Sequence, residues 1–82
     1  MPHPKGETPL LERSLSTLAL GESGVVVRTP TQNERLAEIG LIKGEKVTLL
    51  QVAPLGDPIV LQVLDTPIIL RRSDLAEVIV RT

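Results

Sequence analysis

Few side chains in this sequence have types and spacing suited to chemistry, and the carboxylates of Glu34 and Glu38 are the first pair to consider. Residues four apart lie on one face of a helix, where two carboxylates could share a divalent cation. Arg35 lies beside them and no histidine is near in the sequence. A solvated helix face is therefore the simpler interpretation of this pair.

Nucleophilic catalysis needs a base beside the nucleophile, and the sequence has a single histidine, His3. Pro2 cannot supply the deprotonated backbone nitrogen that an amino-terminal copper or nickel site requires, which leaves His3 as a solvated tail residue. The absence of cysteine removes thiolate nucleophiles, disulfides and cysteine-type zinc sites, and no phosphate-binding glycine motif occurs. We expect no catalytic, cofactor-binding or metal-binding residue.

Arg71 and Arg72 form the one adjacent basic pair. Pairing with acidic neighbours is the simpler role, and donation of an arginine to a partner's phosphate is the alternative. The formal net charge is −1, with acidic and basic residues interspersed, and the chain has no Phe, Trp or Tyr. It therefore lacks both the basic footprint of a nucleic-acid-binding protein and the aromatic surfaces that bind proline-rich peptides or single strands.

Eighty-two residues are enough for one small domain. Residues 1–9 contain three prolines and few apolar groups, which predicts a flexible tail, and residues 10–82 are expected to form a single domain. No apolar run approaches the length of a membrane span, and the first residues have no apolar signal core. We expect a cytoplasmic protein that does not insert into the membrane.

A short helix is predicted over residues 33–39. Thr31 and Glu34 have the T-x-x-E spacing of a capping box, and Gly40 suits the left-handed position that ends a helix. Leu41 is then expected to fold back onto the helix. The residues of this segment therefore specify a local structure, and none of them is a catalytic group.

Short runs rich in β-branched and apolar residues predict five strands, over residues 24–29, 45–53, 59–64, 67–71 and 77–81. Leu10, Leu11, Leu15 and Leu18 recur at near-helical spacing up to Gly21, which predicts a turn or two of helix before the first strand. Asp65-Thr66 predicts a tight hairpin between the third and fourth strands. Ser73 is expected to cap a single helical turn through Leu75. A single antiparallel sheet with short connections must curl to hide its apolar face, so the fold class is mainly β, a small five-stranded barrel.

Alternation along the strands assigns one set of apolar residues to the barrel interior: Val25, Val27, Val47, Leu49, Ile59, Leu61, Val63, Ile68, Leu70, Val78 and Val80. A second set of apolar residues falls on the opposite face of the sheet, or beyond a point where the alternation between the two faces shifts by one residue: Leu50, Val52, Val60, Leu64, Ile69 and Ile79. Either the helix and the amino-terminal segment cover the second set, or it forms an exposed aliphatic patch for a partner or a second copy.

Three segments in this order and spacing resemble the FeoA family of small cytosolic proteins of bacterial ferrous iron uptake: RLAEIGLIKG at 35–44, APLGDPI at 53–59 and ILRR at 69–72. The resemblance covers about residues 14–81. It implies an SH3-like barrel, similar to the third domain of iron-dependent repressors, and a general transition-metal association. The family commonly has a glycine in the hairpin where this chain has Asp65-Thr66, which puts the geometry of that turn in question.

The resemblance also implies a noncatalytic accessory protein that acts as an interaction module on FeoB, the iron permease with a cytosolic GTPase domain. The residues expected to bind the partner are Arg35, Leu36, Ile39, Leu50, Val52, Leu55, Arg71 and Arg72. In a more specific form of this hypothesis, Arg35, Arg71 or Arg72 stabilises the charge that develops during GTP hydrolysis by the partner. The alternative function is a metal-responsive regulatory domain that binds a transition metal ion, and self-association is a further expectation.

Overall fold

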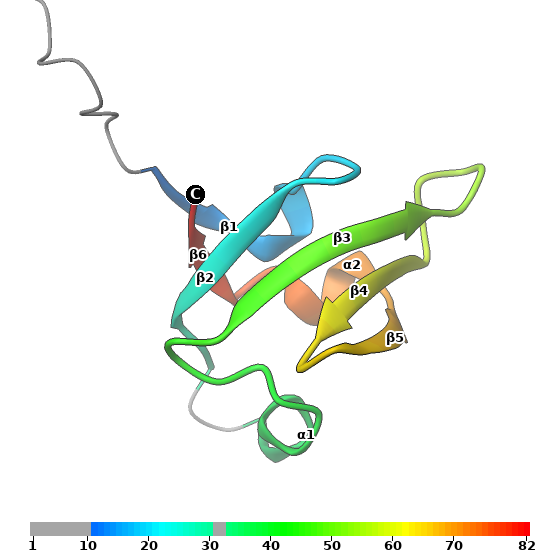
Figure 1. The fold of residues 1–82 in the computed structure, drawn as a ribbon. Coiled ribbons are helices and arrows are strands. Elements are labelled where there is room, and N and C mark those ends of the chain that lie inside the picture. Colours follow the sequence, from blue (N-terminus) through cyan, green and yellow to red (C-terminus); the bar gives the residue numbers. More distant parts are fainter. Residues whose placement is uncertain (1–10, 31–32) are drawn as a thin grey trace, which may run out of the picture.

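The computed structural model describes residues 11–30 and 33–82. The chain is mainly β, with six strands in one antiparallel sheet. Figure 1 shows that this sheet is curved. The strands are β1 (Glu12–Ser14), β2 (Ser23–Arg28), β3 (Lys46–Val52), β4 (Ile59–Val63), β5 (Thr66–Leu70) and β6 (Ile79–Arg81). The helical elements are the 3₁₀ turn η1 (Leu15–Thr17) and the short helices α1 (Glu34–Glu38) and α2 (Arg72–Leu75). No helix in these two ranges is long and apolar enough to cross a membrane.

The six strands form one open sheet in the order β1-β6-β2-β3-β4-β5, with β1 and β5 at its edges, whereas the sequence predicts five strands curled into a barrel. The additional strand, β1, pairs antiparallel with β6 and places Glu12 opposite Arg81. Its three residues are polar and show no alternation, so the sequence pattern gives no strand signal there. Of the helix predicted from Leu10 up to Gly21, the described residues contain only the 3₁₀ turn η1, and β1 takes the place of its first part. Leu15 and Leu18 are buried as such a turn requires, whereas Leu11 is exposed. The tail predicted at residues 1–9 lies outside the described residues.

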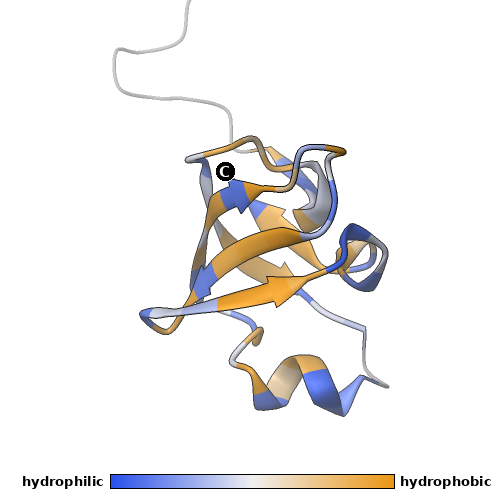
Figure 2. Cartoon of the chain, turned by 90° about the vertical axis from the view of Figure 1, so that its right-hand side faces the viewer, coloured by the Kyte–Doolittle hydropathy of each residue, from blue (hydrophilic) through white to orange (hydrophobic). Residues whose placement is uncertain are grey.

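The core is made of aliphatic side chains from every strand except β1, together with η1, α1 and α2, and Figure 2 shows the apolar colour concentrated on the strands. Most of the predicted interior positions are buried, and Ile68 packs against the core from a partly buried position. The buried set is Leu15, Leu18, Val26, Leu36, Leu41, Val47, Leu49, Ile59, Leu61, Val63, Leu70, Leu75, Val78 and Val80.

The predicted phase of β2 is wrong. Val26 is fully buried, whereas Val25 is 41% exposed and Val27 is half-buried. Gly24 takes the inward position before Val26, where an added Cβ would lie 3.0 Å from the Cβ of Val80. Three consecutive valines show no alternation between apolar and polar residues. The inward glycine, which decides which valine points into the core, has no side chain that a hydrophobicity pattern could detect.

Asn33 is the N-cap of helix α1, and its side-chain Oδ1 accepts a hydrogen bond from the Leu36 N–H at 3.3 Å. Asn33 thus replaces Thr31 as the capping residue, and Thr31 itself lies outside the described ranges. The helix ends as predicted: Gly40 has φ of +98°, and its N–H donates to the Ala37 carbonyl. The Leu41 N–H donates to the Leu36 carbonyl at 2.9 Å, which completes a Schellman motif.

The hairpin between β4 and β5 is shifted by one residue from the prediction. Its two-residue loop is Leu64-Asp65, with φ of 51° and 63°, and Thr66 already pairs with Val63. Positive φ at both loop residues is the geometry that matches the twist of a two-residue hairpin. Leucine is a rare choice for such a position, which is why the sequence points to Asp65-Thr66 instead.

Candidate partner-binding surface

A groove of about 470 Å³ lies over the ends of β3, β4 and β5. It is lined almost entirely by aliphatic and small residues: Leu20, Leu50, Gln51, Val52, Ala53, Pro54, Pro58, Val60 and Ile69. We call this set the aliphatic groove. It contains several members of the apolar set that the alternation pattern left outside the core.

A break in the strand register opens this face. Val60 pairs with Ile69 on one side and with Gln51 on the other, while Leu49 pairs with Leu61. Leu50 is therefore an extra residue in β3, as in a β-bulge, and it is 39% exposed. Ile69, on the edge strand β5, is 70% exposed. Of the two interpretations of the unassigned aliphatic residues, the exposed patch holds for Leu50 and Ile69, and Leu64 in the hairpin is exposed as well.

The other predicted contact residues differ widely in exposure. Leu36 is buried in the core and Ile39 is partly buried against it, so both side chains hold α1 onto the sheet. Val52 is half-buried and lines the aliphatic groove. Leu55 is 97% exposed in the turn between β3 and β4, next to Pro54 of the groove. Surface access therefore favours Leu50, Leu55 and Ile69 as contacts.

A second depression, of about 440 Å³, adjoins the aliphatic groove because Pro58 and Ile69 line both. Its other lining residues are Arg35, Leu70, Arg71 and Asp74, and we call it the arginine hollow. The Arg71 side chain is 70% exposed and its Nη1 lies 3.8 Å from Asp57 Oδ2. A contact this long between exposed groups contributes little, so the guanidinium remains available to a partner.

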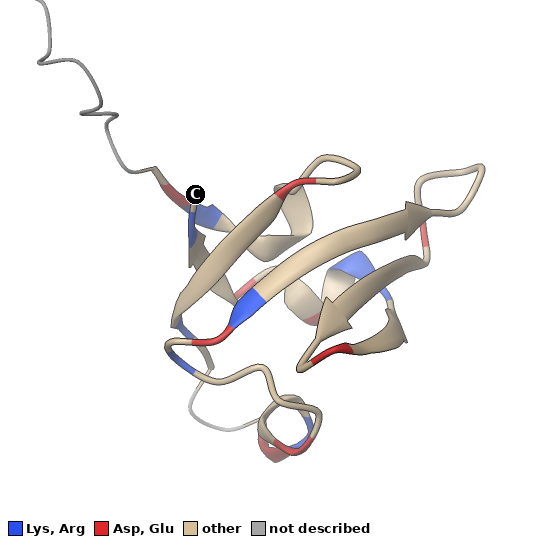
Figure 3. Ribbon diagram, in the orientation of Figure 1, with Lys and Arg blue, Asp and Glu red and all other residues tan. Residues whose placement is uncertain are grey.

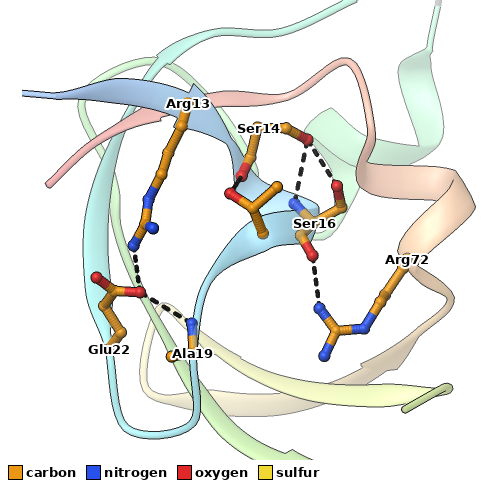
Figure 4. A network of polar contacts seen from close by, with 7 residues as sticks. Arg13, Ser14, Ser16, Ala19, Glu22 and Arg72 are labelled. Atoms are coloured by element: carbon orange, nitrogen blue, oxygen red, sulfur yellow. Dashed lines mark hydrogen bonds and ion pairs between the residues drawn. The ribbon is translucent and has the colours of Figure 1, made fainter.

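Arg72 has a different role from its neighbour Arg71, and Figure 4 shows its contact with Ser16. Its Nε donates to the Gly56 carbonyl at 2.6 Å and its Nη1 to the Ser16 carbonyl at 2.5 Å. Its guanidinium therefore joins the turn before β4 to η1, two segments that are far apart in the sequence. Planar donors in a fixed fork suit this double contact.

Asp57 rather than Ser73 caps α2. The Arg72 backbone N–H donates to Asp57 Oδ1 at 2.8 Å, and the residue at the N-cap position, Arg71, makes no capping hydrogen bond with its side chain. Ser73 lies inside the helix, so the predicted Ser73 cap is wrong. An acceptor from a turn fifteen residues earlier satisfies the helix end, and local sequence spacing cannot reveal it.

Arg13 and Glu22 form an ion pair, and Glu22 Oε1 also accepts a hydrogen bond from the Ala19 N–H at 2.8 Å (Figure 4). The hydrogen bond from Ala19, followed by the interaction with Arg13, lowers the pKa of Glu22 below its ordinary value. Both contacts favour the charged carboxylate. They fasten the turn before β2 to β1 and give this carboxylate a structural role.

The surface charges are mixed in sign (Figure 3). Glu34 and Glu38 are both exposed on α1 with Arg35 between them. Within residues 11–30 and 33–82, no group of three or more His, Asp or Glu side chains is placed to hold a metal ion. His3 lies outside those ranges.

A model of the FeoA domain matches residues 13–82. Over 67 residues the chain is 36% identical to the "Fe(2+) transport protein A/Fe(2+) transporter FeoB fusion protein" of Porphyromonas gingivalis. That match takes in 78% of this chain, and the chain spans only 8% of the length of this relative.

Solved structures share the fold. FeoA from Stenotrophomonas maltophilia, described as a prokaryotic SH3 domain protein and complexed with zinc, is 35% identical, with a TM-score of 0.71 over 82% of this chain and 87% of that chain. IdeR from T. acidophilum, at 21% identity, has a TM-score of 0.71 over 96% of this chain and 38% of that chain, which shows a shared fold alone. The sheet is thus SH3-like. The family model covers residues 13–82, which include the aliphatic groove and the arginine hollow, and this chain therefore belongs to the FeoA family.

Proposed function

We propose that this chain is a noncatalytic accessory domain of ferrous iron uptake, and that it binds the cytosolic part of a FeoB-type permease in the cytoplasm. The proposal concerns a protein–protein contact made through the aliphatic groove. It assigns no turnover to the chain itself.

The fusion relative carries this proposal. A stretch 36% identical to this chain is part of one polypeptide with a FeoB transporter in Porphyromonas gingivalis. Covalent linkage holds two modules at an effective concentration of the order of millimolar, which makes even a weak contact persistent. Where the two modules are separate chains, the interface itself must supply the affinity.

The surface provides such an interface. Apolar side chains that line one continuous depression on a small domain are typical of a protein-binding site. Leu50 and Ile69 stay exposed although their strands bury neighbouring aliphatic side chains, Leu49 and Leu70, in the core. Burial of these side chains by a partner would supply the driving force for association.

Calorimetric titration tests the proposal. The full chain is titrated into the cytosolic region of the FeoB-type permease from the same genome, after nucleotide binding has shown that this region is folded. Saturable binding with a dissociation constant of about 1–100 μM is expected for a transient interface. Absence of binding to the folded region would overturn the proposal.

The second candidate function is a metal-responsive regulatory domain, which is favoured by the zinc in the Stenotrophomonas maltophilia FeoA structure. Titration of the full chain with zinc, and with ferrous ion under anaerobic conditions, separates the two functions. A stoichiometric site of micromolar affinity or better, together with a metal-dependent change in partner binding, would favour the metal-responsive role.

A further inference from the structure

The aliphatic groove and the arginine hollow form one surface, since Pro58 and Ile69 line both. One part of this surface is apolar and the adjoining part carries two guanidinium groups. A partner that covers both parts therefore needs apolar side chains over the groove and, next to them, a charged group over the hollow.

The apolar part is built to receive side chains from outside. Ala53, Pro54 and Pro58 have short side chains, and they lie among longer aliphatic ones. The chain has no aromatic residue of its own to fill such a depression. Large apolar side chains of a partner therefore fit the groove, as in the pockets that surround interface anchors.

Addition of a strand to the sheet is a poor way to dock here. The exposed edge beside the groove belongs to β5, which contains Pro67 opposite Gln62. In a two-residue hairpin the pair next to the loop, Val63 and Thr66, is hydrogen-bonded, so the next pair directs its backbone groups outward. Proline at that outward position removes a donor that an added strand would need. The partner is therefore expected to lie across the strands on the groove.

The charged end selects a carboxylate. Arg35, Arg71 and Asp74 are the charged residues that line the arginine hollow, so its lining has one positive charge in excess. The 3.8 Å contact of Arg71 with Asp57 is long and exposed, so a partner's carboxylate can replace it at little cost. Arg72 cannot serve in the same way, because two backbone carbonyls already accept from its guanidinium.

We infer that this combined surface binds an amphipathic segment of the permease's cytosolic region, with apolar side chains in the aliphatic groove and an adjoining Asp or Glu on Arg71. The inference rests on the proposed function and specifies how the partner is recognised. A second copy of this chain, bound by the same surface, is the competing occupant that the test must separate.

The test compares the affinity of four variants for the dye-labelled cytosolic region of the permease, measured by fluorescence anisotropy. Ile69→Glu places a charge in the groove, and Leu11→Glu is its control, since Leu11 is exposed beside the opposite edge strand β1. Arg71→Gln removes the charge at the hollow, and Lys43→Gln is its control, since Lys43 is exposed in a depression beside β2 and β6. Far-UV circular dichroism verifies that each variant is folded.

Ile69→Glu is expected to weaken binding about tenfold or more, and Arg71→Gln about three- to tenfold with a flatter dependence on salt. The two controls are expected to bind like the parent chain. If the parent binds and all four variants bind equally well, the inference is wrong while the proposed function stands. If the parent does not bind, the proposed function fails, and the inference fails with it. Concentration-dependent dimerisation that Ile69→Glu abolishes, with permease binding unchanged, would assign the surface to a second copy.

Discussion

Leu64 lies directly against Gly40. A Cβ built on Gly40 would lie 2.6 Å from Leu64 Cδ1 and 3.1 Å from Val63 Cγ1. The residue that ends α1 is therefore also the surface on which the β4–β5 hairpin packs. Arg35 comes from α1 and Ile69 from β5, so this contact fixes the two sides of the arginine hollow relative to each other.

Replacement of Gly40 by alanine is expected to destabilise the fold by about 2–3 kcal/mol, because it combines a left-handed backbone with a side-chain overlap. Gly44→Ala is the matched control: its φ is +95°, but nothing lies within 4 Å of the added Cβ. The free energy of unfolding of this control should fall by only about 1 kcal/mol. Urea unfolding followed by far-UV circular dichroism measures both, as the chain has no Trp or Tyr to report by fluorescence.

A double variant separates the two causes. Leu64→Ala removes the overlapping methyl group, so Gly40→Ala should cost less in that background than in the parent chain. Equal losses for Gly40→Ala and Gly44→Ala in the parent chain would contradict the packing role of Leu64.

Arg72→Lys is expected to lower the free energy of unfolding by about 1–3 kcal/mol. An ammonium is a single point charge on a flexible stem and cannot keep both contacts, to the Ser16 and Gly56 carbonyls, in the fixed geometry of a guanidinium. Arg71→Lys is the neighbouring control and should stay within about 0.5 kcal/mol of the parent. Chemical denaturation of the three proteins compares them, and equal stabilities would show that Arg72 does not join the two segments.

The stability of the fold should depend on pH through Glu22. Folding lowers the pKa of this carboxyl, so its contribution is present above the ordinary glutamate pKa of about 4.3 and is lost as the pH falls through the lowered value. Glu22→Gln should therefore be less stable than the parent near neutral pH, with the difference shrinking in acid. Thermal unfolding midpoints across this range measure the effect. A difference that is constant with pH would contradict it.

GTP hydrolysis tests the arginine hypothesis for the permease. If Arg71 or Arg35 stabilises charge in the transition state, addition of the chain should raise the GTPase rate of the cytosolic region, and Arg71→Gln or Arg35→Gln should lower that rise. Arginine residues supplied to other GTPases raise kcat by about 10³–10⁵, so even a partial effect would be measurable. Unchanged rates at saturating concentrations of the chain would remove this hypothesis and leave a binding role alone.

Local signals in the sequence predict much of the fold. Gly40 ends α1 as expected, and the alternation in β3 and β4 identifies buried residues such as Leu49 and Leu61. Prediction fails where distant contacts decide the outcome. The phase of β2 depends on Gly24 against Val80, and the cap of α2 comes from Asp57.

The candidate surface is partly predictable for the same reason. Leu50 and Ile69 do not fit the alternation that identifies the core residues, which makes them candidates for an exposed patch. Both side chains are exposed in the structure. Sequence alone cannot separate Arg71 from Arg72, since adjacent residues of one type differ only in what the fold places around them. The position of Leu36 in the core is likewise a consequence of how α1 packs.

The most direct test of the account is a ¹⁵N–¹H correlation spectrum of the labelled full chain with the unlabelled cytosolic region of the permease. The account predicts shifts or broadening at the amides of Leu50, Val60, Ile69 and Arg71. Amides of Arg28, Lys43 and Arg81, in the depression beside β2 and β6, should stay unchanged. Changes confined to this second group, or a spectrum that a folded permease region leaves unaltered, would contradict it.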